Sequence, residues 1–184
     1  MFEINKKNQK KKKGFTLVEL LVGIGIFSIV VSVVISLFIS AILVQGTIVR
    51  YQRLLNEISY TAEYMSRSLR MADVVERGAC GIETGKHYKI EQDGQKVTFL
   101  NANSNECWSF YLESGKLMVE RKGKQYPLTA EDAKVENFKV KVTGDEGSGI
   151  PRITFTLWVK MKNASHFYSL PKIVIQSTVS PRNF

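Results

Sequence analysis

The sequence has few residues of the kinds that enzymes use for acid–base, nucleophilic or metal chemistry. Its only histidines, His87 and His166, stand far apart, and its only cysteines, Cys80 and Cys107, lack the pair spacing of a zinc site. No metalloprotease, serine-hydrolase or phosphate-loop motif occurs. Residues 144–149 contain acids and glycines but not the repeated ligands of a calcium loop, so we expect a turn there. We predict a protein that is not an enzyme and uses no metal or cofactor.

Glu19 is the charged residue whose position calls for a chemical explanation. It is the only charged residue in the thirty-residue apolar run from Phe15 to Val44. A carboxylate in the middle of a bilayer costs about 2.5–3.5 kcal/mol on insertion scales, so such a residue usually has a function or a partner. Either Glu19 extends to the lipid headgroups from near the helix end, or it pairs with a cation.

The apolar run around Glu19 is long enough to cross a bilayer as one helix. Residues 1–14 hold six lysines and one acid, whereas the remaining 170 residues carry a net charge of only +4. Lysines on this side predict a cytoplasmic N-terminus, with everything after Val44 across the membrane. The run is too long for an ordinary secretory signal, and the residues that follow it make a poor cleavage site, so the simplest interpretation is an uncleaved anchor.

The residues at the start of this helix favour a more specific interpretation. Gly14-Phe15-Thr16-Leu17-Val18-Glu19-Leu20-Leu21, after a lysine run, resembles the processing site of type IV prepilins and type II secretion pseudopilins. The resemblance covers about the first 45 residues. It implies that a membrane peptidase cuts between Gly14 and Phe15 and methylates the new amine of Phe15. The leader is then lost and the helix is retained.

The same resemblance implies an assembly role for Glu19, which would meet the Phe15 amine of a neighbouring subunit in a filament. It also implies the partners: the prepilin peptidase/methyltransferase, other pilin or pseudopilin subunits, the inner-membrane assembly platform, and membrane lipid before assembly.

The apolar helix departs from the family in its small and helix-breaking residues. Many members have glycine and proline where this chain has Ser28 and Ser36, so no breaker is expected before Gly46. Serines instead recur at every fourth residue, at 28, 32, 36 and 40. They either let helices approach closely or donate hydrogen bonds back to their own helix.

An amphipathic helix is predicted after the apolar run, over residues 46–77. Its apolar positions alternate at spacings of three and four: Ile48, Tyr51, Leu55, Ile58, Ala62, Met65, Leu69 and Ala72. A dimeric coiled coil fits this spacing, but packing on the chain's own head domain fits better. Arg77-Gly78 is the expected end.

Residues 78–184 are predicted to form an antiparallel β head. Asp93-Gly94 and Ser114-Gly115 each separate two strand-like runs and indicate hairpins. Alternating strands are expected around Phe138–Val142, Ile153–Met161 and Ile173–Val179, and a single helical turn at Thr129–Asp132. The predicted fold class is α+β: a long N-terminal helix, half transmembrane and half amphipathic, packed on an antiparallel sheet, as in pilins. The predicted segments are 1–14 leader, 15–45 membrane and filament-core helix, 46–77 stalk and 78–184 head.

The two cysteines are expected to form a disulfide. Both lie on the side of the membrane predicted to be oxidising, where an even number of cysteines favours a bond. The alternative is two buried thiols that act as small apolar residues.

The predicted function is that of a structural filament subunit in a type IV pilus or type II secretion pseudopilus. It begins as a single-pass protein of the cytoplasmic membrane, with its head outside. The stretches Met65–Arg70 and Ile173–Arg182 resemble minor pilins and J-type minor pseudopilins. The alternative is a filament-tip module for DNA uptake or surface adhesion. This module would bind phosphates through a basic sheet face formed by Lys139, Lys141, Lys160, Lys162 and Lys172. Lysines on the solvent-facing side of a sheet, however, more often keep the protein soluble and protect its edges from pairing.

Overall fold

The computed structural model describes three stretches of the chain, residues 14–144, 150–162 and 172–182. Three features of the sequence lie outside the described residues: most of the expected leader (1–13), most of the expected turn (145–149) and His166. The chain divides into two units, Met1–Ile48 and Val49–Phe184.

Helix α1 (Leu17–Leu69) contains every residue of the first unit that the structure places in regular structure. It is unbroken up to Gly46, so the expectation that no residue breaks the helix before Gly46 is confirmed, and it continues beyond that glycine. Nearly all side chains from Phe15 to Ile48 are exposed. In this part of the chain the apolar side chains have no protein core to enter.

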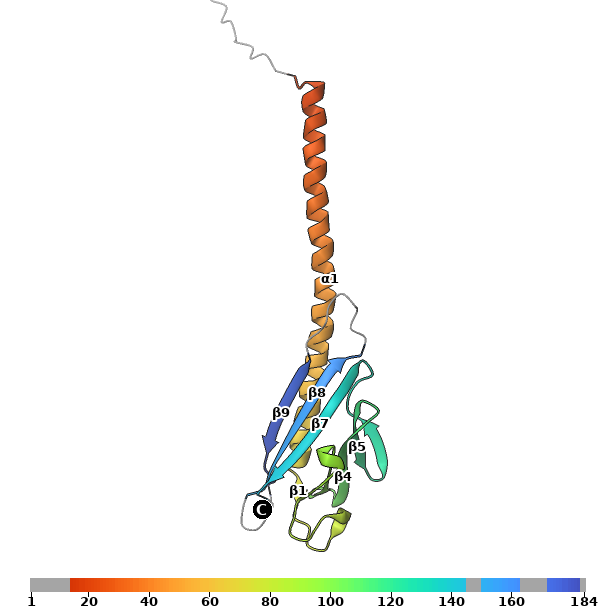
Figure 1. The fold of residues 1–184 in the computed structure, drawn as a ribbon, viewed down its shortest axis with the longest axis vertical. Coiled ribbons are helices and arrows are strands. Elements are labelled where there is room, and N and C mark those ends of the chain that lie inside the picture. Colours follow the sequence, from red (N-terminus) through yellow and green to blue (C-terminus); the bar gives the residue numbers. More distant parts are fainter. Residues whose placement is uncertain (1–13, 145–149, 163–171, 183–184) are drawn as a thin grey trace, which may run out of the picture. The chain divides into compact units, whose positions relative to one another are not determined.

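In the second unit, one stripe of α1 packs into the head domain. Leu54, Ile58, Ala62, Met65 and Leu69 are buried, and their spacing of three or four residues places them on one helix face. The same unit holds the strands that cover this face (Figure 1). The prediction that the amphipathic helix packs on its own head is therefore confirmed, rather than the coiled coil.

The predicted end of the helix at Arg77-Gly78 is wrong, because α1 ends at Leu69. Ala72 satisfies the helical spacing, yet it belongs to the short strand β1 (Ala72–Asp73) and pairs with Asn101. The carbonyl of Met71 accepts the backbone N–H of Ala102 at 2.8 Å. Backbone pairing with the sheet therefore competes successfully with continuation of the helix.

Six strands form the first antiparallel sheet, in the order β1-β3-β4-β5-β6, with β2 also pairing with β3. Their bounds after β1 are β2 Tyr88–Glu91, β3 Lys96–Asn101, β4 Glu106–Glu113, β5 Lys116–Arg121 and β6 Lys124–Pro127. A second antiparallel sheet has the order β7-β8-β9: β7 Ala133–Thr143, β8 Arg152–Met161 and β9 Ile173–Val179. The α+β fold class is thus confirmed, with two sheets in place of the single expected sheet (Figure 1).

The core lies where the α1 stripe meets both sheets. Phe99 and Phe110 from the first sheet, and Phe138 and Phe155 from the second, are fully buried in one cluster with this stripe. In β8, and in β7 on either side of an irregularity between Val135 and Asn137, alternate residues are buried and the residues between them are more exposed, as the sequence pattern predicts.

The local turn predictions have different outcomes. Ser114-Gly115 is the predicted two-residue turn, since Glu113 pairs directly with Lys116. At Asp93-Gly94 the hairpin exists, but its loop has four residues, because Glu91 pairs with Lys96. The helical turn expected at Thr129–Asp132 is wrong: buried Thr129 accepts the backbone N–H of Leu117 through Oγ1 at 3.2 Å.

Candidate processing and assembly site

The junction between Gly14 and Phe15 lies just before α1 and is open on all sides within the described residues. The Phe15 side chain is 84% exposed. A Cβ atom added at Gly14 would meet no other atom within 4 Å, and the backbone there has no positive φ. The fold itself therefore does not require glycine at this position, whereas a peptidase that must bind the chain closely would.

Thr16 and Glu19 form the N-terminal cap of α1. The Glu19 backbone N–H donates to Thr16 Oγ1 at 3.2 Å, and Glu19 Oε2 lies 3.4 Å from the Thr16 backbone nitrogen. This reciprocal arrangement is a capping box, in which two backbone N–H groups without helical partners are satisfied. The Thr-x-x-Glu signature was present in the sequence, but our sequence analysis missed it. Glu19 thus has a local structural role as well as its expected role between subunits.

The helix that follows this cap presents an almost wholly apolar surface. Leu17, Leu20 and Phe27 are each more than half exposed, as are most apolar residues up to Ile48. By length and composition, α1 qualifies as a membrane-spanning helix. An apolar surface this long cannot stay in water, so it must be covered by lipid or by other protein chains.

The serines of this segment donate their hydroxyls to their own helix. Ser28, Ser32, Ser36 and Ser40 each donate to the carbonyl four residues earlier, at 2.8–3.0 Å. The structure shows the local bonding of the second alternative, and the close approach of neighbouring helices stays a prediction. These bonds satisfy the hydroxyl donors inside an apolar environment and leave the helix exterior free for packing.

Cys80 and Cys107 are joined by a disulfide, with their Cα atoms 5.5 Å apart. Cys80 lies in a short 3₁₀ segment (Ala79–Gly81) after α1 and β1, and Cys107 lies in β4. The bond therefore links the irregular segment after the helix to the centre of the six-stranded sheet.

The lysines of the candidate basic face are largely paired with acids. Glu136 forms ion pairs with Lys160 and with Lys172, the latter at 2.7 Å, and these two ammonium groups lower the pKa of Glu136 to about 2. Lys139 lies 3.4 Å from Asp93. Three of the five lysines thus already have carboxylate partners, which weakens this face as a phosphate-binding surface.

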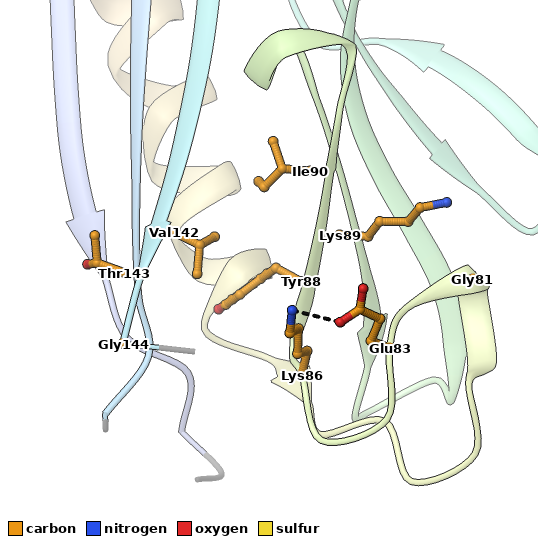
Figure 2. Close-up of a pocket in the computed structure, with 9 residues that line it drawn as sticks. All are labelled: Gly81, Glu83, Lys86, Tyr88, Lys89, Ile90, Val142, Thr143 and Gly144. Atoms are coloured by element: carbon orange, nitrogen blue, oxygen red, sulfur yellow. Dashed lines mark ion pairs between the residues drawn. The ribbon is translucent and has the colours of Figure 1, made fainter. Parts of the chain in front are cut away.

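A hollow of about 560 Å³ lies in the head beside β2 and the end of β7 (Figure 2). Tyr88, Ile90 and Val142 supply apolar side chains, and Lys86 forms an ion pair with Glu83 at 2.7 Å. Across the part of the chain that the structure describes, no three His, Cys, Asp or Glu side chains are grouped to hold a metal ion.

Comparison with known proteins identifies the N-terminal segment. Residues 9–35 match the model of the prokaryotic N-terminal methylation motif, a span that includes Gly14, Phe15 and Glu19. No curated protein and no solved structure matches the chain. The beginning of the chain is thus a methylation motif of the kind found in type IV pilin-like proteins.

Proposed function

We propose that the chain is a structural subunit of a type IV pilus or type II secretion pseudopilus, of the minor class, and not an enzyme. One observation carries the proposal: the methylation motif lies at the start of a long helix. The first part of this helix is exposed and apolar, and one face of its last part is buried in its own head domain. Such a helix has one segment for lipid or neighbouring helices and another that fixes the head. The stretches Met65–Arg70 and Ile173–Arg182 support the minor class only by resemblance.

Processing is the first step of the proposed function. A prepilin peptidase/methyltransferase removes residues 1–14 and methylates the new amine of Phe15. The open Gly14–Phe15 junction is accessible to such an enzyme, and the cut leaves α1 intact. Residues 15–45 then form the membrane helix, with the N-terminus in the cytoplasm and the head outside.

Assembly is the second step, and it gives Glu19 its partner. In the membrane, the carboxylate is held locally by the cap with Thr16. On leaving the lipid for the filament, it pairs with the Phe15 amine of a neighbouring subunit, which is cationic after methylation. An inner-membrane platform and other subunits take part in this transfer, and the exposed apolar side chains exchange lipid for protein contacts.

The proposal is tested by substituting the glycine before the cut. We expect Gly14→Leu to block removal of the leader when the chain is produced with a prepilin peptidase, because a large side chain would clash with the enzyme and not with the chain's own fold. Gly46→Leu is the matched control, since a Cβ at Gly46 also meets nothing within 4 Å. Normal processing of Gly14→Leu, or equal loss of processing in both variants, would contradict the proposal.

A further inference from the structure

Strand β9 (Ile173–Val179) is an edge strand that lacks the usual protection against pairing. Its sequence, Ile-Val-Ile-Gln-Ser-Thr-Val, contains no charged residue and no proline. It pairs with β8 on one side only. No other described segment makes a backbone hydrogen bond to residues 173–179.

The other sheet edges carry the features with which proteins prevent unwanted strand pairing. β6 contains Lys124 and Pro127, and β7 has several lysines and an irregularity between Val135 and Asn137. β1 and β2 are only two and four residues long. Charges, proline, irregularities and shortness all disfavour added strands. Among the described edges, β9 is therefore the one suited to accept another strand.

We propose that β9 is a docking edge for an extended segment of a different polypeptide chain, which adds a strand to the three-stranded sheet. Backbone hydrogen bonds along seven residues, about 23 Å of strand, would supply most of the affinity. The uncharged sequence of β9 favours an uncharged middle in the added strand, because a charge opposite it would be partly desolvated without a partner.

A second copy of this chain is a poor occupant. Ser66 Oγ lies 3.3 Å from Ser177 Oγ, and the Arg182 backbone N–H donates to the Arg70 carbonyl at 2.9 Å, so β9 and the end of α1 run in the same direction. Symmetric pairing of two β9 strands would be antiparallel and would set the two copies of α1 antiparallel as well. Under the proposed function, every copy of α1 enters the membrane in the same orientation, which excludes an antiparallel pair of α1 helices. The choice of a different chain as the partner therefore rests on the proposed function.

The C-terminal end of β9 adds a charge requirement for the partner. Arg70 and Arg182 are adjacent there through their backbone hydrogen bond, and both are exposed. No carboxylate within the described residues forms an ion pair with either of them, whereas nearby Arg67 pairs with Glu63. We therefore assign the partner strand an acidic residue at the end that lies beside these two arginines.

The test uses hydrogen exchange on the full chain in detergent micelles, with synthetic peptides as probes. Each peptide has seven alternating threonine and valine residues. Two of the four peptides carry two aspartates, one peptide at its N-terminal end and the other at its C-terminal end. The other two peptides carry two lysines at the same positions. One aspartate peptide should slow amide exchange in residues 173–179, and its lysine counterpart should bind about fivefold more weakly. The double variant Arg70→Gln, Arg182→Gln should remove this difference, while Arg50→Gln, Arg53→Gln, with the same loss of charge, should preserve it.

Two results would overturn the proposal. One is unchanged exchange in residues 173–179 with every peptide at millimolar concentration. The other is exchange that is already slow without peptide in a dimeric particle, which would mean that a second copy occupies the edge. Both readouts concern β9 alone, so they are independent of whether the chain is cut after Gly14. A failure of strand docking is thus distinguishable from a failure of the proposed function.

Discussion

Thr16 and Glu19 hold each other across the first turn of α1, with the Glu19 backbone N–H 3.2 Å from Thr16 Oγ1 and Glu19 Oε2 3.4 Å from the Thr16 nitrogen. A glutamate in an apolar segment therefore has two explanations that must be separated: a helix cap, which needs only a hydrogen-bond acceptor, and an ion pair with a neighbouring subunit, which needs a charge.

Glutamine at position 19 separates these two roles, because it serves in a capping box but carries no charge. We expect Glu19→Gln and Glu19→Ala to be cut normally and both to fail in assembly. Removing one partner of a buried ion pair costs about 3–5 kcal/mol, which corresponds to a hundredfold or greater loss of incorporation. The measurement is the ratio of processed protein in sheared filaments to that in the membrane. If Glu19→Gln assembles like the wild type while Glu19→Ala does not, capping explains Glu19 and the ion pair is refuted.

The disulfide gives a second prediction. We expect unreduced, denatured protein to show no free thiol, since both of its cysteines lie in the Cys80–Cys107 bond. The double variant Cys80→Ala, Cys107→Ala should lose about 3–4 kcal/mol of unfolding free energy, because the bond closes a loop of 27 residues in the unfolded chain. Wild-type protein with a reducing agent is the control and should show the same loss. Two titratable thiols in the untreated wild type would contradict this prediction.

Glu57 should make the head less stable as the pH rises. Burial and the charge of Asp132 raise the pKa of Glu57 above its usual 4.5, against a smaller opposing effect of Arg53. A carboxyl group with a raised pKa in the folded state favours folding when protonated. The unfolding free energy therefore falls as the pH rises from 4.5 through the folded-state pKa, and it is level above that pKa. Glu57→Gln should remove this fall and make the protein more stable than the wild type at pH 7. Urea unfolding between pH 4 and pH 7 measures it, and a variant less stable than wild type at pH 7 would refute it.

Glu136 should have the opposite pH dependence. Lys160 and Lys172 lower its pKa to about 2, so its stabilisation is complete above pH 4.5 and is lost as the pH falls toward 2. Glu136→Gln should therefore be less stable than the wild type at pH 5, and the difference should close by pH 2. Glu131→Gln, at an exposed acid with no ion pair among the described contacts, is the control and should show no such trend. A difference that stays constant from pH 5 to pH 2 would exclude the ion pairs as its cause.

The elements that depend on neighbouring residues were predictable from the sequence. The apolar helix, the Ser114-Gly115 turn and the alternating strands β7 and β8 follow from local chemistry and spacing. The end of α1 was not predictable, because Ala72 fits the helical spacing and only its pairing with Asn101 shows that the helix has stopped. The division of the strands into two sheets likewise depends on contacts between residues far apart in the chain.

For the candidate site, the sequence indicated the motif residues but not the ion pairs of the head. The resemblance to prepilin processing sites singled out Gly14, Phe15 and Glu19, and residues 9–35, which include all three, match the methylation motif. The roles assigned to these residues stay predictions. The pairing of Lys160 and Lys172 with Glu136 was not foreseen, because the irregularity near Val135 changes which residues of β7 face water. The Thr16–Glu19 cap was visible in the sequence and was overlooked.

Intact-mass analysis of protein extracted from the membrane tests the central claim most directly. The account predicts a chain that begins at Phe15, carries one additional methyl group on its N-terminus and retains all of α1. A mass that includes residues 1–14, or a chain that begins near Gly46, would contradict the assignment of the protein as a processed filament subunit.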